Sequence, residues 1–347
     1  MSAESVLDVG GAWASLGLKV GLLTAFFLLA PLVVGYMEHK VMARMQNRLG
    51  PMEAGGFHGW AQLIADGAKF LQKESITPSA ADRRVFALAP VVVVAPTLAV
   101  LAVVPLGPGL WAERLDAGIF FALAASSVTV LGILMAAWAS ASKFSLIGGM
   151  RAAGQLIAYE VPLLLAAAAV VVQAETLSLV GIVEAQAGFE LLGLGITVPY
   201  VVPHVVGFAL FMIAAMAELA RPPFDMPIAD SEIIAGHMTE YTGMRYAFFM
   251  LAEYAGLVVL SALAVVLFLG GWYPWPGVGI PDGPAGQVVG FLVTSAKIGL
   301  LAFVMVWLRS TFPRLREDQL QRVSWLVLIP VGLANLVAVS VAKVVAS

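Results

Sequence analysis

The chain has 347 residues, of which 61% are hydrophobic and 12% are charged. Soluble domains carry about 25% charged residues, so this composition excludes an ordinary soluble fold and indicates a chain that lies in lipid. The absence of cysteine excludes thiolate-held iron–sulfur clusters, thiol nucleophiles and disulfides within the chain, and a net charge of −3 gives no support for nucleic-acid binding.

Eight segments are apolar enough to cross a bilayer, because a spanning α-helix needs about 20 predominantly apolar residues. The predicted spans are residues 16–37, 85–106, 117–139, 154–173, 198–220, 246–269, 287–308 and 324–345. Membrane helices tolerate the prolines inside four of them, Pro31, Pro96, Pro162 and Pro203, because neighbouring groups satisfy the freed carbonyls. The sequence therefore predicts an all-α integral membrane protein, a bundle of about eight transmembrane helices that forms a single membrane domain over residues 1–347.

The lysines and arginines predict which side of the membrane each loop faces. All of the 19 except Lys19, Arg114, Lys297 and Lys343 lie in the first long loop between predicted helices or in the loops on its side of the membrane. Inner loops carry the excess of basic residues. We therefore expect both termini on the outer (periplasmic) side.

The first inner loop, residues 38–84, is too long for a simple turn and contains a predicted amphipathic helix at 57–73. On a helical wheel of about 100° per residue, its apolar and polar side chains fall on opposite faces. The apolar set is Phe57, Trp60, Ala61, Ile64, Ala68 and Leu71, and the polar set is His58, Gln62, Asp66, Lys69, Gln72 and Lys73. Since no soluble domain exists for it to cover, the helix is expected to lie in the membrane interface.

A basic stripe precedes this helix. Lys40, Arg44 and Arg48 are spaced at i, i+4 and i+8, so they share one face where the first span emerges. Taken alone, the stripe favours anchoring to anionic lipid.

Four ionisable residues inside the predicted spans are functional candidates, because a charge within a bilayer costs on the order of several kcal/mol. Glu160, Glu218 and Glu253 lie near the inner ends of three helices, and Lys297 lies near the middle of the seventh. Each can simply join helices through a pair. Three glutamates at a similar depth favour instead a polar chain through the bundle, in which neighbouring charges change protonation as a proton relay requires.

The acidic inner loop, residues 221–246, directly follows Glu218 and carries Asp225, Asp230, Glu232 and Glu240. No nucleotide-binding motif is present and no spacing of acids and histidines suggests a metal site. The isolated His204 and His237 are interpreted as hydrogen-bonded structural groups rather than as ligands.

Six stretches of the sequence together resemble one family. They are MEHKVMARMQNRLGP (37–51), LIADGAKFLQKE (63–74), SKFSLIGGMRAAGQLIAYE (142–160), AELARPPFDMPIADSEIIAGHMTEYTGM (217–244), FFMLAEY (248–254) and RSTFPRLREDQL (309–320). In this order they are similar to the H subunits of bacterial NADH–quinone oxidoreductase, respiratory complex I.

The resemblance implies a multi-pass subunit of the bacterial inner membrane within a proton-translocating oxidoreductase. It implies quinone, either ubiquinone or menaquinone, as substrate, and no redox centre, metal or iron–sulfur cluster in this chain. The implied partners are peripheral subunits that carry the terminal iron–sulfur cluster and complete the quinone chamber, small membrane subunits that lead to antiporter-like subunits, and membrane lipids.

The resemblance also implies roles for individual residues. Beside the quinone chamber it places His39, Arg48, Asp66, Lys69, Arg221, Phe224 and Glu240. In the connecting loop it places Asp225, Asp230 and Glu232. In the buried proton path it places Glu160, Glu218 and Glu253, with Lys297 and Arg309 nearby.

This chain departs from the family pattern at three places. His39 stands where the family usually has arginine, and because an imidazole titrates near about pH 6.5, the fixed charge there is weakened. Ile228 stands in place of a carboxylate, which leaves the acidic loop with one member fewer. Met52 and Glu53 replace the usual Asn-Arg after Gly50-Pro51, which puts lipid or partner contacts there in doubt.

Two other functions compete with that of a complex I membrane protein. One is the homologous membrane subunit of an energy-converting hydrogenase-type complex, which the identity of the copurifying partners would distinguish. The other is a stand-alone secondary transporter, but such proteins often show internal repeats and paired broken helices, and neither is visible here.

Overall fold

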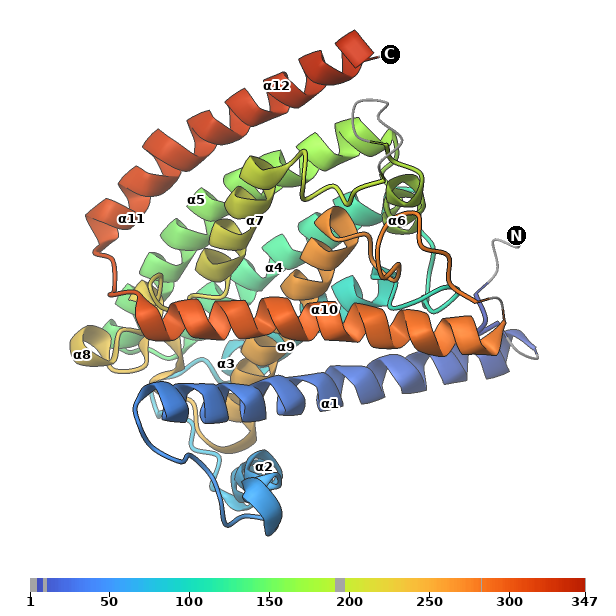
Figure 1. Cartoon of the computed structure of the whole chain (residues 1–347). Coiled ribbons are helices and arrows are strands. Elements are labelled where there is room, and N and C mark those ends of the chain that lie inside the picture. The colour runs from blue at the N-terminus through green and yellow to red at the C-terminus, as the bar shows by residue number, and fades with distance from the viewer. Residues whose placement is uncertain (1–4, 9–10, 191–196, 282, 347) are drawn as a thin grey trace.

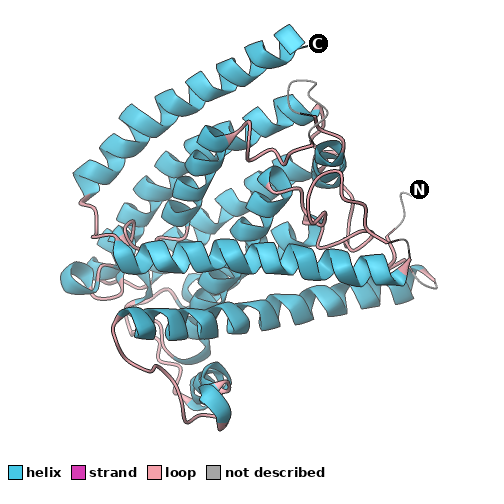
Figure 2. Cartoon of the chain, in the orientation of Figure 1, coloured by secondary structure: helices cyan, strands magenta, loops and turns pink. Residues whose placement is uncertain are grey.

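The computed structural model describes residues 5–8, 11–190, 197–281 and 283–346, and the described elements are helices joined by loops, as Figure 2 shows. In chain order they are α1 (Ala12–Met45), η1 (Phe57–Gly59), α2 (Gln62–Gln72), α3 (Arg83–Val103), α4 (Gly118–Ala139), α5 (Lys143–Ala174), α6 (Leu179–Ala187), α7 (Val205–Glu218), η3 (Met226–Ile228), α8 (Asp230–Ile233), η4 (Gly236–Met238), α9 (Gly243–Phe268), α10 (Pro284–Thr311), α11 (Glu317–Val323), η5 (Ser324–Leu328) and α12 (Ile329–Ala346).

The predicted all-α membrane bundle is confirmed. Within the described part of the chain, 7 helices are long and apolar enough to span a bilayer, namely α1, α3, α4, α5, α9, α10 and the continuous stretch Glu317–Val345, and the shorter apolar α7 accounts for the remaining predicted span. The start of α1 and the end of α12 lie on one side of the bundle, and α8 and α11 lie on the other (Figure 1). This arrangement agrees with an even number of crossings.

Three boundaries differ clearly from the prediction. α1 continues to Met45, so the first residues of the predicted 38–84 loop are helical. α7 begins at Val205, after Pro203, because the prolines at 199 and 203 lack backbone donors and the preceding residues form turns, with the Val201 N–H donating to Phe268 O at 2.8 Å. Pro203 is therefore outside a helix. α5 begins at Lys143, well before residue 154, so Arg151 lies on a helix and not in a loop.

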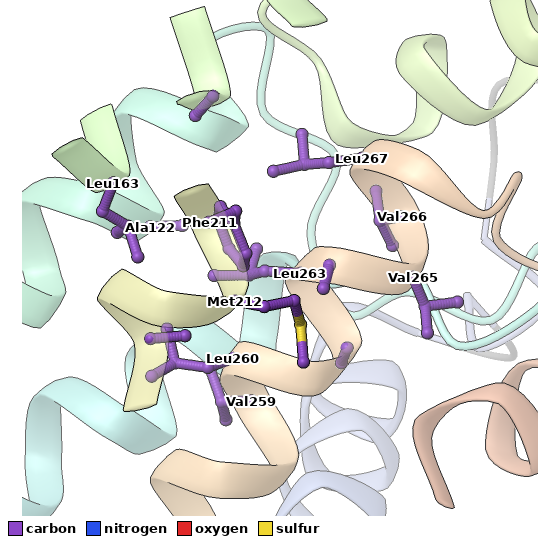
Figure 3. Close-up of a cluster of buried hydrophobic side chains, with 14 of the residues drawn as sticks. Ala122, Leu163, Phe211, Met212, Val259, Leu260, Leu263, Val265, Val266 and Leu267 are labelled. Carbon is purple, nitrogen blue, oxygen red and sulfur yellow. The ribbon is translucent and has the colours of Figure 1, made fainter. Parts of the chain in front are cut away.

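α9 is the centre of the bundle. Of its most apolar 18 residues 78% are buried, against 11% for the stretch Glu317–Val345, which runs along the edge in Figure 1. Figure 3 shows Leu260 and Leu263 of α9 beside Phe211 and Met212 of α7 in the core. Side chains that would hold charge in α9 are consequently withdrawn from lipid.

Small residues allow the helices to approach closely. A Cβ on Gly149 of α5 would lie 2.2 Å from the Ala137 Cβ of α4, and one on Gly132 would lie 2.6 Å from Val93 Cγ2 of α3. Membrane helices associate through such van der Waals packing, since lipid tails are as apolar as the helix surfaces.

The predicted amphipathic helix is present as η1 followed by α2, separated because His58 and Gly59 have positive φ of 57° and 65°. α2 contacts α1 and α9. Phe70 packs against Tyr246 of the α9 helix with ring centroids 5.7 Å apart, while Trp60 and Leu71 point outward, 59% and 70% exposed. The outward apolar face is the one that the sequence predicts for contact with lipid.

Candidate functional site

Four charged side chains from distant parts of the chain form an ion cluster with a buried centre, Glu38, Arg221, Glu253 and Arg309. Arg221 Nη1 lies 2.6 Å from Glu38 Oε2, and Arg221 Nε lies 3.0 Å from Glu253 Oε1. Arg309 pairs with the other oxygen of Glu38. The side chains of Glu38 and Arg221 are each only 2% exposed. Two guanidinium groups thus balance two carboxylates, which is the condition under which buried charges persist.

The turn after α7 positions Arg221. Gln155 of α5 donates from Nε2 to Ala217 O and to Phe224 O, both at 2.7 Å, and so ties the two sides of the turn together. The Arg221 guanidinium also lies over the Tyr254 ring, 4.7 Å from its centroid. Burial opposes the charge on Arg221, but the nearby Glu253 and Glu38 outweigh it and raise its pKa, so it is a permanent cation.

A cavity of about 120 Å³, lined mostly by apolar side chains but also by two carboxylates, adjoins the ion cluster. Glu253 belongs to both, because it lines the cavity and pairs with Arg221. Glu218 of α7 and Ser126 and Thr129 of α4 also line the cavity.

Glu160 of α5 lies beside this cavity. It accepts a hydrogen bond from Ser127, and its charge acts on Glu218. Within the described part of the chain, Glu218 Oε2 is buried without a hydrogen-bond partner. The structure therefore brings the three predicted glutamates to one region from three different helices.

The acidic loop is tied to neighbouring elements by ion pairs at the protein surface. Asp225 lies 3.0 Å from Arg314 Nε, and Glu232 lies 2.6 Å from Arg151 Nη1. The hydrogen bond from Arg151 lowers the pKa of Glu232 below its ordinary value. Asp230 opens α8, and its side chain lies outside the described part of the structure.

Three of the predicted chamber residues lie close to one another near α2. Lys69 Nζ lies 2.6 Å from Asp66 Oδ1, and the charge of His39 also acts on Asp66. Partial burial raises the pKa of Asp66, but hydrogen bonds from Lys69 and Gln62 outweigh it, and the net pKa falls below its ordinary value. The carboxylate is therefore ionised near neutral pH.

The other predicted chamber residues are placed elsewhere. Arg221 is part of the ion cluster, and Phe224 is buried against Tyr159, with ring centroids 5.4 Å apart. Arg48 lines an open basic groove with Lys40, and Glu240 is half-buried in the turn before α9.

Lys297 is also placed apart from the glutamates. Its Nζ donates to the carbonyls of Leu269, Gly271 and Tyr273 at 2.5, 3.1 and 2.6 Å, just beyond the carboxyl end of α9. Leu269 is sixteen residues along from Glu253, or about 24 Å at a helical rise of about 1.5 Å per residue.

Sequence reasoning missed Glu38 as a member of the site, although it identified the adjacent His39. Glu38 directly follows the predicted first span, and the signal that it offered was a carboxylate at the same predicted depth as Glu160, Glu218 and Glu253. Its partners lie 183 and 271 residues away, which no local pattern reveals.

Comparison with known proteins gives a consistent result. A family model described as NADH dehydrogenase matches residues 18–340. The chain is 41% identical over 343 residues to the H subunits of NADH-quinone oxidoreductase from Anoxybacillus flavithermus and Geobacillus kaustophilus, and 40% identical to the one from Bacillus mycoides. Each alignment covers 98% of this chain and 98% of the relative.

Proposed function

Because the chain belongs to the NADH dehydrogenase family and its relatives are H subunits of NADH-quinone oxidoreductase, we propose that it forms the membrane part of a quinone chamber and couples quinone reduction to proton translocation. In this proposal it sits in the bacterial inner membrane with both termini outside. Its inner loops meet the peripheral subunits that carry the terminal iron–sulfur cluster, and its buried glutamates lead toward the small membrane subunits.

The observation that supports coupling most strongly is the double role of Glu253. This carboxylate pairs with Arg221 on one side and lines the cavity with Glu218 on the other. A change in its protonation therefore acts on both sets at once. In this proposal, a charge change at the ion cluster reaches the cavity through this shared carboxylate.

The substrate supplies the charge change, since a quinone gains negative charge on reduction and needs protons. The residues of this chain provide the response. Arg221 pairs with Glu38 and Glu253, and protonation of Glu253 would weaken its ion pair with Arg221. Glu160 acts electrostatically on Glu218, so a proton that reaches the cavity changes the interaction between these two side chains.

The surface near α2 is the proposed chamber wall. Asp66 and Lys69 sit on the side of α2 away from its exposed apolar face, and His39, which acts electrostatically on Asp66, is next to Glu38 on α1. Charge can thus be passed from the wall to the ion cluster over adjacent residues of α1.

The decisive experiment replaces Glu218 by Gln in the assembled complex. The amide keeps the shape and hydrogen-bonding capacity but holds no exchangeable acid proton, so quinone reduction and proton translocation should both fall while assembly is normal. Glu218→Asp should restore part of each.

The measurement is protons translocated per quinone reduced in sealed vesicles, together with the turnover rate. Electron transfer to an artificial acceptor serves as the control for the peripheral subunits. A full rate with a full proton ratio in the Gln variant would leave Glu218 as a residue that only joins helices.

A further inference from the structure

His237 is a buried titratable residue to which the proposed function assigns no role. It lies in η4 within the acidic loop, is 5% exposed, and packs edge-to-face on Phe249 of α9 with ring centroids 5.5 Å apart. Its Nδ1 is buried without a hydrogen-bond partner among the described residues. This contradicts the expectation that His237 is a hydrogen-bonded structural group and requires another explanation.

The ring lines the same cavity as Glu218 and Glu253. The loop contributes Pro227, Ile228, His237 and Met238 to the cavity wall. The other polar lining side chains are Thr97 of α3, Ser126 and Thr129 of α4, Glu218 of α7 and Glu253 of α9, and α5 lines it with Ala152 and Leu156. Among the described lining residues, the titratable groups that share the cavity with His237 are therefore the two glutamates.

The backbone around His237 holds the ring in place. Gly236 has a φ of +53°, and a Cβ there would lie 1.9 Å from Pro227 O. A Cβ on Gly148 of α5 would lie 2.5 Å from Gly236 Cα and 2.9 Å from His237 N. η4 is thus in close contact with η3 and α5, and neither glycine accepts a side chain without moving the histidine.

The chemistry of this position suits proton transfer. Burial lowers the pKa of His237 to about 4, so the resting ring is neutral and offers one donor and one acceptor nitrogen. The cavity of about 120 Å³ has room for about four water molecules at about 30 Å³ each. Two carboxylates facing the ring would stabilise a transient imidazolium.

We propose that His237 is a proton-relay residue of the acidic loop that exchanges protons with Glu218 and Glu253 through water in the cavity. A proton leaves one carboxylic acid for a ring nitrogen, which gives an imidazolium–carboxylate pair, and the ring then releases a proton to the other glutamate and returns to its neutral form. Of the loop residues that line the cavity, Pro227, Ile228, His237 and Met238, the histidine is the one with a titratable side chain. This inference rests on the proposed function.

The test uses the whole complex in sealed vesicles with His237→Phe and His237→Gln. Phe keeps the aromatic contact with Phe249, and Gln keeps hydrogen-bonding capacity, but neither accepts and releases a proton. Both variants should assemble, retain the KM for quinone, and lose turnover by about tenfold, at the lower end of general acid–base effects because cavity water remains. The solvent deuterium isotope effect on turnover should rise, since proton transfer becomes limiting.

His204→Phe is the matched control. His204 is also buried, 1% exposed, and both of its ring nitrogens lack partners in the described part of the chain, but it does not line the cavity. Its replacement should leave turnover and the isotope effect unchanged. Wild-type turnover and an unchanged isotope effect in either His237 variant would overturn the relay, as would failure of both variants to assemble, which would make the ring a structural requirement.

Glu218→Gln in the same assay separates this inference from the function on which it rests. If Glu218→Gln impairs coupling and the His237 variants do not, His237 is only a packing residue and the proposed function stands. If Glu218→Gln has no effect either, the proposed function itself fails.

Discussion

Two charged regions lie toward opposite ends of α9, and different partners stabilise the charge in each of them. Toward the amino-terminal half of α9, in what we call the inner region after the predicted orientation, Arg221 pairs with Glu38 and Glu253, and Arg309 pairs with Glu38. Beyond the carboxyl end of α9, in what we call the outer region, Lys297 is surrounded by three backbone carbonyls. Carbonyl oxygens do not titrate, whereas the carboxylates can each take a proton. We therefore expect a charge inside a membrane helix to take part in coupling only where its partners can change their own charge.

The largest effect is expected from breaking the inner region at its centre. Arg221→Gln leaves Glu38 and Glu253 buried with one cation, Arg309, and removing one partner of a buried pair costs about 3–5 kcal/mol. We expect little assembled complex, and in what assembles a fall in quinone reductase activity of about 10²-fold or more.

Arg221→Lys is the matched variant for that test. Lysine keeps the charge but lacks the planar guanidinium whose donors pair with both glutamates, so the complex should assemble but with reduced activity. The measurements are complex abundance on native gels and quinone reductase activity per assembled complex. Near-normal activity in Arg221→Gln would show that the cluster does not need its central cation.

The next largest effect is expected at the surface near the inner region, on α2. Asp66→Asn removes the partner of Lys69 on α2 while preserving shape. We expect quinone reductase activity to fall by about tenfold, the size of about 1.4 kcal/mol, while electron transfer to an artificial acceptor survives. An equal loss of both activities would mean that Asp66 is needed for assembly and not for the chamber.

A substitution in the outer region should lower the stability of the complex without changing its turnover rate. Lys297→Met removes three hydrogen bonds, and each bond to a charged group contributes about 1.5–3 kcal/mol. We expect a lower melting temperature of the purified complex, with turnover and the proton ratio per assembled complex unchanged. A reduced proton ratio would remove the contrast between the two ends of α9 and return Lys297 to the coupling path.

The smallest effect is a dependence of stability on pH near the inner end. The folded-state pKa of His237, about 4, lies below the ordinary value of 6.5, so the unfolded chain binds the extra proton first. The stabilisation is complete above about pH 6.5 and is lost as the pH falls toward 4. The melting temperature of the wild-type complex should therefore drop more steeply over this window than that of His237→Phe; parallel curves would show that the ring is not buried as a neutral base.

Much of the site was visible in the sequence as residue types at a common depth, but its connections were not. Glu160, Glu218 and Glu253 were recognisable because carboxylates in apolar segments are rare. Their grouping with Ser127 and Arg221 was not, since it depends on which helix faces turn toward one another. Lys297 was expected near the glutamates, but the chain folds back after α9 and brings the carbonyls of residues 269–273 to its ammonium group.

The sequence by itself determined the helices and their membrane character, because a spanning helix satisfies its own backbone hydrogen bonds and needs only a long enough apolar segment. It also determined the amphipathic α2, because the spacing of apolar and polar residues along a helix is a local pattern. The tertiary structure alone decided that Glu38 pairs with residues 183 and 271 positions away. It also decided that Glu253 belongs to both the ion cluster and the cavity lining, and that His237 lines the same cavity. Ion pairs and cavities are properties of packed surfaces, and packing between apolar helices is selected by close side-chain fit, which hydropathy does not encode.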